Sequence, residues 1–283
     1  MIKSIAHNAL KVTDMERSLD FYCNTIGLEK AFDISDDNGK PWIVYLKICK
    51  NAFIELFYDG VKDHDPAYDF KNIGYHHFCI SVGDIQNLAD RLYEKNIIES
   101  PKPSLGKDQN LSLWINDPDG NAVEFVQYTP ESLHMKSNHE AVYHYETKGF
   151  TGIGHMAFSV DNMEETLRLY RDVLEFEKIH EFNDDNGKPW LVYLRVKDGS
   201  YIELFYGATE KINRKDSGAG FLHICLECDD VYTTVAELQK KNIKIDIAPM
   251  QGKDKNCQAW ITDPDGNRIE LMTIDPDSPQ AKV

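Results

Sequence analysis

The stretch Asp36-Asp37-Asn38-Gly39-Lys40-Pro41-Trp42, with the apolar run Ile54-Glu55-Leu56-Phe57-Tyr58 behind it, decides how the chain is organised, because it occurs twice. Asp184-Asp185-Asn186-Gly187-Lys188-Pro189-Trp190 and Ile202-Glu203-Leu204-Phe205-Tyr206 repeat it 148 residues later. Each copy carries one glutamate, Glu55 or Glu203, in a run that is typical of a buried strand. A carboxylate in such a run costs free energy unless it is paired or binds a metal. The question is therefore what stabilises these two glutamates.

Around this stretch, the chain repeats one order of elements. The alternation in residues 1–13 predicts a strand, and an apolar stripe between Asp14 and Gly27 predicts a helix. Three short strands follow, around 30–34, 42–48 and 53–58, with Asn38-Gly39 as the first hairpin turn. The same order starts again with strands that contain His77, His155 and His223. The sequence thus predicts an α+β fold built from four β-α-β-β-β modules.

The repeat also predicts the domain organisation. Two domains of ordinary size are expected at residues 1–130 and 151–275, with two modules each. Residues 131–150 lack a clear period and are predicted to be a linker, and residues 276–283 a loose tail. The pairing of the modules stays open. Either the two modules of each half close a cup, or modules exchange across the linker and bring His7 and Glu55 to His223 and Glu270.

Composition and charge exclude several classes of partner. The formal net charge of -16 argues against binding to nucleic acid or an anionic membrane. No apolar run approaches the ~20 residues that span a bilayer. The first residues, Met1 to His7, lack the apolar core of a signal peptide. We therefore expect a cytoplasmic protein, a monomer or homodimer, that acts on a small molecule.

The four modules share one histidine and one glutamate at matching places. The histidine lies in the opening strand and the glutamate in the closing strand; the positions are His7, His77, His155 and His223, and Glu55, Glu124, Glu203 and Glu270. A lone strand histidine is more often a core residue than a ligand, but here eight positions agree. Two facing modules would bring two histidines and two glutamates together, a set suited to a divalent ion such as Zn, Ni, Co or Mn. The alternative is a metal-free cup.

These positions also carry a family resemblance. The segment from His7 to Tyr22 resembles the opening of glyoxalase I (lactoylglutathione lyase). Asp117-Pro118-Asp119-Gly120-Asn121 with Glu124, and Asp263-Pro264-Asp265-Gly266-Asn267 with Glu270, resemble the closing signature of the vicinal oxygen chelate superfamily. The resemblance implies two tandem domains of the glyoxalase/bleomycin-resistance/dioxygenase type. Each would be a curved mixed sheet forming a metal-lined cup with helices outside, and the eight residues would be the ligands.

Further residues are predicted to contact the substrate. Strand parity favours Tyr45, Tyr193 and Arg195, and the position next to the closing turns favours Trp114 and Trp260. Lys11 stands where glyoxalase I usually has an arginine that holds a glutathione carboxylate, and the other half has Ser159. Asp59 and Gly207 replace a typical asparagine. These differences weigh against a glutathione carboxylate being held at either place.

Three functions are compatible with this pattern. The first is a metal-dependent lyase or isomerase of the glyoxalase I type, which stabilises an enediolate formed from an α-oxo or α-hydroxycarbonyl substrate or its thiol adduct. The resemblance implies Glu124 or Glu270 as its base. The second is an extradiol-type dioxygenase, which needs Fe(II) with two histidines and only one carboxylate. The third is a non-catalytic binding or resistance protein of the same fold, a class that often loses the ligands.

Overall fold

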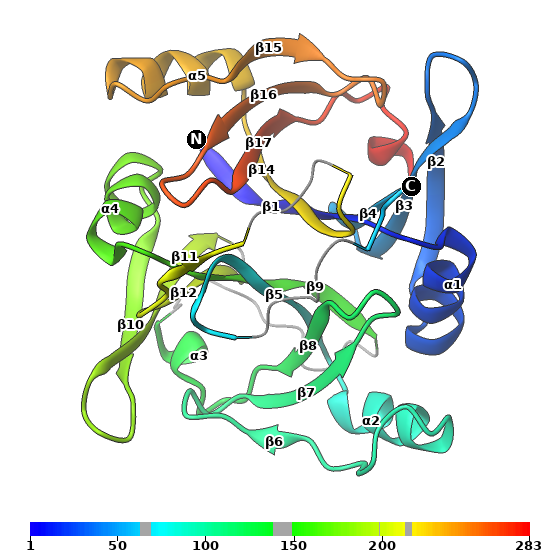
Figure 1. The fold of residues 1–283 in the computed structure, drawn as a ribbon, viewed down its shortest axis with the longest axis vertical. Helices are drawn as coiled ribbons and strands as arrows, with labels where there is room; N and C mark the ends of the chain where they lie inside the picture. The colour runs from blue at the N-terminus through cyan, green and yellow to red at the C-terminus, as the bar shows by residue number, and fades with distance from the viewer. Residues whose placement is uncertain (63–68, 138–148, 198, 213–216) are drawn as a thin grey trace.

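Two curved sheets form the body of the protein in the computed structural model, which describes residues 1–62, 69–137, 149–197, 199–212 and 217–283 (Figure 1). In neighbour order, the first sheet contains β15 (Ile247–Gln251), β16 (Cys257–Thr262), β17 (Arg268–Thr273), β14 (Gly220–Cys228), β1 (Ile2–Lys11), β4 (Ala52–Phe57), β3 (Pro41–Cys49) and β2 (Glu29–Ser35). The second contains β10 (Glu177–Asn183), β11 (Pro189–Lys197), β12 (Ser200–Phe205), β9 (Phe150–Ser159), β5 (Asn72–Val82), β8 (Ala122–Gln127), β7 (Leu111–Asn116) and β6 (Ser104–Leu105). The short β13 (Glu210–Lys211) pairs with β5 outside this order.

The strand order shows how the modules pair. Strands β1 to β4 belong to the first module, and they share a sheet with β14 to β17 of the fourth. The second and third modules form the other sheet in the same way. The predicted α+β class and the four modules are confirmed, and the chain adopts the crossed pairing that the sequence left open. The boundaries at residues 130 and 151 therefore separate the two sequence repeats and not the two sheets.

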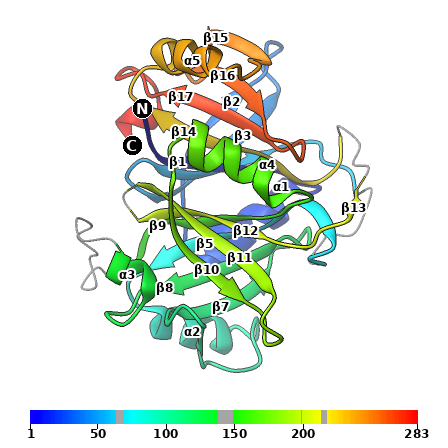
Figure 2. The same cartoon turned by 90° about the vertical axis from the view of Figure 1, so that its left-hand side faces the viewer.

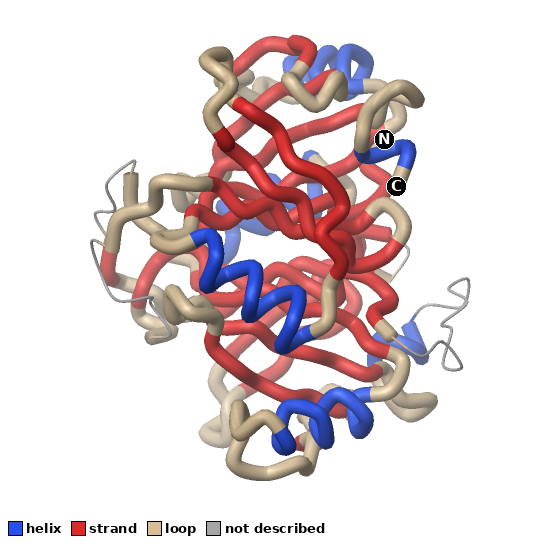
Figure 3. The backbone as a smooth tube through the Cα atoms, turned by 90° about the vertical axis from the view of Figure 1, so that its right-hand side faces the viewer, coloured by secondary structure: helices blue, strands red, loops and turns tan. Residues whose placement is uncertain are grey.

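The helices lie outside the sheets, with α5 (Val231–Lys240) and α2 (Ile85–Glu94) at opposite ends of the long axis (Figures 2 and 3). Along the sides run α1 (Met15–Leu19) and α4 (Met163–Leu167), while α3 (Leu133–Ser137) follows β8. The side chain of Asp14 accepts a hydrogen bond from the Arg17 N–H, which confirms it as the N-cap of α1.

In the first and third modules the helix is not α-helical throughout. Its second part is a π-helix, where the sequence predicted one continuous helix. The chain continues after α1 as a π-helix, Asp20–Ile26, and after α4 as a second one, Arg168–Val173. Gly27 ends the first with a φ of 103°, and its N–H donates to the carbonyl of Tyr22. Over so short a segment, an α-helix and a π-helix place the same apolar residues on one face. The sequence pattern alone therefore does not distinguish the two kinds of helix.

One hydrophobic core joins the two sheets. Ile54 and Leu56 of β4 are fully buried in the same cluster as Phe78 of β5 and Phe158 of β9. The two faces of β4 therefore differ, because Ile54 and Leu56 pack into the core while Phe53 belongs to a separate cluster with Tyr45. Burying an aliphatic side chain of this size stabilises the fold by about 1.5–3 kcal/mol.

The closing signature joins the two modules of each half. The hydroxyl of Tyr22 donates to Asp117 at 2.9 Å, and the backbone N–H of Thr13 donates to Asp119 at 3.0 Å. In the second half Tyr170 donates to Asp263 at 3.1 Å. Strands therefore connect modules across the halves, whereas helices and signature turns connect modules within a half.

The two segments that were predicted to be irregular are partly ordered. The tail is not loose, because Ser278 and Gln280 are buried and the amide of Asn256 donates to Gln280 Oε1 at 2.9 Å. A 3₁₀ turn, Gln280–Lys282, ends the chain. Of the predicted linker, residues 138–148 lie outside the described residues. In the part that the structure describes, no helix is both long and apolar enough to cross a membrane.

We predict that a fragment of residues 1–130 forms a dimer. In it β1 loses β14 and β5 loses β9, so each module exposes an unpaired central strand that a second copy can cover. Size-exclusion chromatography with light scattering measures the mass. A folded, monomeric fragment would show that the crossed pairing is dispensable.

Candidate functional site

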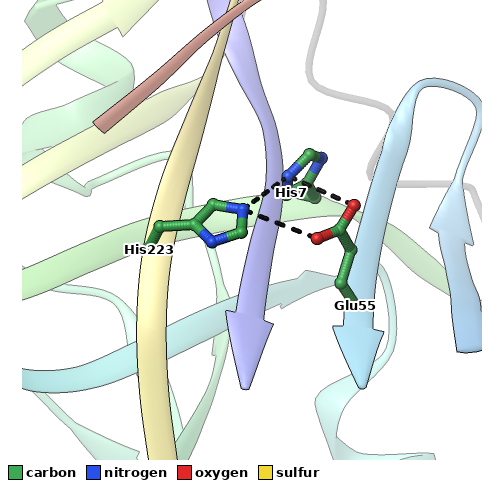
Figure 4. A group of neighbouring side chains, drawn as sticks. All are labelled: His7, Glu55 and His223. Carbon is green, nitrogen blue, oxygen red and sulfur yellow. Dashed lines mark hydrogen bonds and ion pairs between the residues drawn. The ribbon is translucent and has the colours of Figure 1, made fainter. Parts of the chain in front are cut away.

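The first cup is built on four adjacent strands of the first sheet, and each strand supplies one polar side chain. His7 Nε2 lies 3.2 Å from His223 Nε2, 3.4 Å from Glu55 Oε1 and 3.0 Å from Glu270 Oε2. Figure 4 shows His7, His223 and Glu55 pointing toward one another from β1, β14 and β4. Glu270 comes from β17, and its Oε2 lies 3.3 Å from His223 Nε2. We call these four residues cup 1.

The second sheet carries the matching group, cup 2. His77 Nε2 lies 2.9 Å from His155 Nε2, and these histidines stand on β5 and β9. Glu124 of β8 approaches His155 at 2.9 Å, and Glu203 of β12 approaches both histidines at 3.4 Å. The structure thus gathers all eight predicted ligand positions into two groups of four.

Strand register explains why these side chains meet. In the first sheet Ala9 lies opposite both Glu55 and His223, and in the second Ala157 lies opposite both Glu203 and His77. His7 and His155 are two residues before these alanines and therefore share their face. Both alanines are fully buried. Their small side chains leave the space into which the polar groups converge.

Both groups are buried without a permanent positive charge beside them. None of the eight residues is more than 8% exposed. In the described part of the chain, the ion pairs of the four glutamates are all with histidines. Four buried carboxylates without a lysine or arginine partner are costly, and a bound cation would offset this cost.

The donor atoms fit a divalent metal ion. Nitrogen and oxygen ligands lie about 2.0–2.2 Å from ions such as zinc, which places neighbouring ligands roughly 3.0–3.5 Å apart. The separations in both cups, from 2.9 to 3.5 Å, agree with this spacing. Cys225 adds a sulfur donor in cup 1, because its thiol lies within 4.8 Å of ligand atoms of His7 and Glu270. Sequence reasoning had not assigned it to the site.

The cups hold protons that a metal ion would displace. In cup 2, burial and the nearby Glu124 raise the pKa of Glu203 to about 7, although His155 opposes this shift. In cup 1, burial would lower the pKa of His223, but hydrogen bonds to Glu270 and Glu55 raise it to about 9. Burial would likewise raise the pKa of Glu124, yet the charge and hydrogen bond of His155 bring it to about 2.

Four predicted substrate contacts lie beside the ligands. The ring of Trp114 is 4.7 Å from that of His77, and the ring of Trp260 is 4.7 Å from that of His223. Tyr45 and Tyr193 stand at 6.2 Å from His7 and 5.9 Å from His155. The two tryptophans differ, because Arg268 covers Trp260 at 4.4 Å while Trp114 is 45% exposed.

Two predicted contacts lie elsewhere. Lys11 lines a groove of about 770 Å³ between the two sheets, away from the ligand atoms. Arg195 donates to the carbonyl of Ser137 at 3.0 Å and pairs with Glu177. Strand parity placed Arg195 on the correct face, but its long side chain reaches outward to α3 and β10. The roles of all six residues stay predictions.

The repeated hairpin closes over each cup. Lys107 donates to Asp185 at 2.7 Å and lies 5.3 Å from the ring of Trp190. Lys253 makes the same contacts with Asp37 and Trp42, at 2.5 and 5.5 Å. In cup 2 the Lys107–Trp190 contact borders a pocket of about 200 Å³ that also contains His77, Glu124 and Glu203. The repeated Asp-Asn-Gly-Lys-Pro-Trp stretch thus forms a contact between modules at the rim.

A polar network that was not predicted from the sequence lies beside each cup. Asn110 donates to Asp108 at 2.6 Å and bonds His134 Nδ1 at 2.9 Å. In cup 1, Asn256 bridges Asp254 and Gln280 in the same way. Burial and the charges of Glu270 and Glu55 raise the pKa of Asp254 to about 6. The matching Gly-Lys-Asp loops were visible as a repeat, but only the fold brings α3 and the tail to them.

The comparisons with known proteins place the chain in a family. The model of the Glyoxalase/Bleomycin resistance protein/Dioxygenase superfamily matches residues 4–125 and 152–271. Glyoxalase I of Saccharomyces cerevisiae is 25% identical over 313 residues, covering 94% of this chain and 91% of that protein. This relative is an enzyme that matches almost the whole chain, so the expectation of an enzyme is confirmed.

Solved structures share the fold. Glyoxalase I from Zea mays superposes with a TM-score of 0.69 at 18% identity, covering 95% of this chain and 92% of that one. A protein from Bacillus subtilis named "putative dioxygenase" superposes with a TM-score of 0.76 at 15% identity, covering 99% and 88%. With the family model matching both repeats, the chain belongs to the glyoxalase/bleomycin resistance protein/dioxygenase superfamily.

We predict that metal binding releases protons and weakens as the pH falls. His223 is protonated below pH about 9 in the metal-free protein, and Glu203 below pH about 7, and each must lose its proton to bind a cation. The affinity of cup 1 should fall by up to about tenfold per pH unit between pH 9 and 7. Calorimetric titration in buffers of different ionisation enthalpy counts the protons. Binding without proton release in this range would contradict the charge states described above.

Proposed function

We propose that the chain is a metal-dependent lyase or isomerase of the glyoxalase I type. Its substrate would be the hemithioacetal of an α-oxoaldehyde and a thiol, and its product the thioester of the corresponding α-hydroxy acid. The observation that carries the proposal is the pair of cups, each with two histidines and two glutamates on four neighbouring strands. The nearly full-length match to the yeast glyoxalase I supports the same reaction class.

The eight cup residues would hold one divalent ion in each sheet. Imidazole and carboxylate donors suit Zn, Ni, Co or Mn, and Zn or Ni would be our first choice. When bound, the ion supplies Lewis-acid stabilisation of the negative charge on an enediolate. The protein supplies an aromatic surrounding for the buried donors, because Tyr193, Trp114 and Phe205 border the pocket of cup 2. Exclusion of water strengthens every electrostatic interaction in the site.

A glutamate would move the proton. The base takes the proton from the carbon that carries the hydroxyl and the sulfur, and it returns this proton to the neighbouring carbonyl carbon. The proton of the hydroxyl moves to the former carbonyl oxygen, which becomes the hydroxyl of the product. We assign this role to Glu124 in cup 2 and Glu270 in cup 1. Glu203 is the competing base in cup 2, because its carboxylate lies 3.4 Å from both histidines of the cup and is thus the second carboxylate at the same centre. The two assignments make different predictions.

The pocket limits how much of the substrate is enclosed. Its volume of about 200 Å³ is below the range of roughly 300–1,000 Å³ that holds a drug-sized ligand. The reacting oxo end fits inside, and the body of the thiol would extend over the rim. Asp59, which departs from the usual asparagine, is paired with Lys40 at 2.6 Å. This ion pair reduces the repulsion of a carboxylate near Asp59, so glutathione is a reasonable first thiol to test.

The other two functions have less support. An extradiol-type dioxygenase needs three open positions on Fe(II), whereas the fourth donor in each cup would fill one of them. A non-catalytic binding protein does not need eight metal-type donors in matching places. Elemental analysis of purified protein, with a methylglyoxal–glutathione assay on the same sample, tests all three. Bound Zn or Ni together with thioester formation would support our proposal. Bound iron together with oxygen uptake on catechols would support the dioxygenase, and the absence of bound metal would support the binding protein.

We predict that Glu124→Gln with Glu270→Gln lowers kcat by about 10²–10⁴-fold, the range of a general base. Glutamine keeps an oxygen donor and the side-chain size, so the fold should remain, and kcat is expressed per bound ion because a neutral donor holds a cation less tightly than a carboxylate does. The assay follows thioester formation by its absorbance, with metal content measured on the same samples.

The matched control is Glu55→Gln with Glu203→Gln, which alters the other carboxylate of each cup. In this variant the metal affinity should fall, while the turnover per bound ion should change less. If turnover per bound ion falls in the control and not in the first variant, Glu203 and Glu55 are the bases and our assignment is wrong.

A further inference from the structure

The two cups differ in the residue that precedes one of the proposed ligands. In cup 2, Nδ1 of His77 lies 2.8 Å from Nδ1 of His76. The residue before the matching ligand of cup 1, His223, is Leu222, which has no polar atom in its side chain. We propose that His76 is a positioning residue that holds His77 in its metal-binding tautomer, so that cup 2 retains its ion more tightly than cup 1. This inference rests on the metal dependence proposed above.

A bulge in β5 brings the two rings together. Neighbouring strand residues normally point to opposite faces, so adjacent histidines should not meet. The register between β5 and β9 shifts at this point, because Tyr75 pairs with Phe158 and His77 with Ala157. His76 is the extra residue, and a bulge of this kind re-aims a side chain. In the first sheet the register shifts at the matching place, between Ala9 and Leu10 of β1, and there Leu222 is the extra residue.

The ring of His76 is held in one orientation. Phe70 stacks on it at 4.4 Å with an interplanar angle of 15°, and Phe205 lies 5.4 Å away. The side chain is only 7% exposed. Because both neighbours are aromatic and the ring is buried, the Nδ1 atom of His76 stays directed at His77.

The hydrogen bond determines where the proton of His77 sits. Nε2 of His77 faces His155 and the two glutamates, so it must carry a lone pair to bind a cation. The proton then resides on Nδ1, which donates it to Nδ1 of His76. Metal-binding histidines commonly donate their second N–H to such a partner, and removing that partner costs about 10–100-fold in metal affinity. In cup 1 the residue at the place of His76 is Leu222, whose side chain cannot accept such a proton.

The test exchanges the two residues between the cups. His76→Leu gives cup 2 the residue that cup 1 has at this position, and Leu222→His gives cup 1 the residue of cup 2. The wild-type protein is loaded with Zn²⁺ and titrated with a competing chelator, and the bound zinc is measured by elemental analysis. We expect two classes of zinc that differ about 10–100-fold in affinity. His76→Leu should remove the tight class, and Leu222→His should tighten the weak one.

Two further measurements separate positioning from packing. Nitrogen NMR of the metal-free protein should show His77 as the Nδ1–H tautomer, and this preference should be lost in His76→Leu. His76→Gln keeps an acceptor for the Nδ1–H and should recover part of the affinity, while circular dichroism verifies that each variant is folded. Folded His76→Leu that keeps both the tight class and the tautomer would overturn this inference alone. Wild-type protein that binds no divalent ion would overturn the proposed function and this inference together.

Discussion

The pairing of β1 with β14, and of β5 with β9, is the constraint on which both cups depend. Each pair lies at the centre of a sheet and carries both histidines of one cup, while the flanking strands carry the glutamates. A ligand set that spans four strands exists only while those strands stay in register. A slip by one residue would turn every side chain of the moved strand to the opposite face. The buried polar groups are therefore positioned by backbone hydrogen bonds that lie far apart in the sequence.

A second set of contacts keeps the two sheets together. The signature turns bind the helix of the preceding module through Tyr22 and Asp117 in one half and Tyr170 and Asp263 in the other. Strand pairing links the first module to the fourth, whereas these helix contacts link the first to the second. The two kinds of contact interlock all four modules around one hydrophobic core. The most recognisable motif of the sequence thus belongs to the scaffold, and the chemistry belongs to residues beside it.

The repeat singled out the eight histidines and glutamates because each kind of position occurs four times, and the structure gathers these residues into two groups; their role as metal ligands stays a prediction. It did less well with the surroundings. Arg195 and Lys11 were assigned from parity and resemblance; their long side chains end at α3 and in the groove between the sheets, and their role in substrate binding stays a prediction. The tail was predicted to be loose, but Gln280 reaches the floor of cup 1 because Asn256 offers it a hydrogen bond. His76 was visible only as a residue next to a ligand, since its role requires a bulge that period-2 alternation does not reveal.

The sequence by itself determined the modules, their order and the histidines and glutamates that we propose as metal ligands, because these depend on local periodicity and on repetition. It did not determine which modules share a sheet. An exposed edge of β1 offers the same backbone donors and acceptors to any antiparallel strand, so its sequence alone does not name β14 as the partner. Only the tertiary structure decided this, because the apolar faces of both sheets and the helix contacts must be satisfied at once. The same packing brought Lys107 to Asp185 and Lys253 to Asp37, and so turned a repeated hairpin into the rim of each cup.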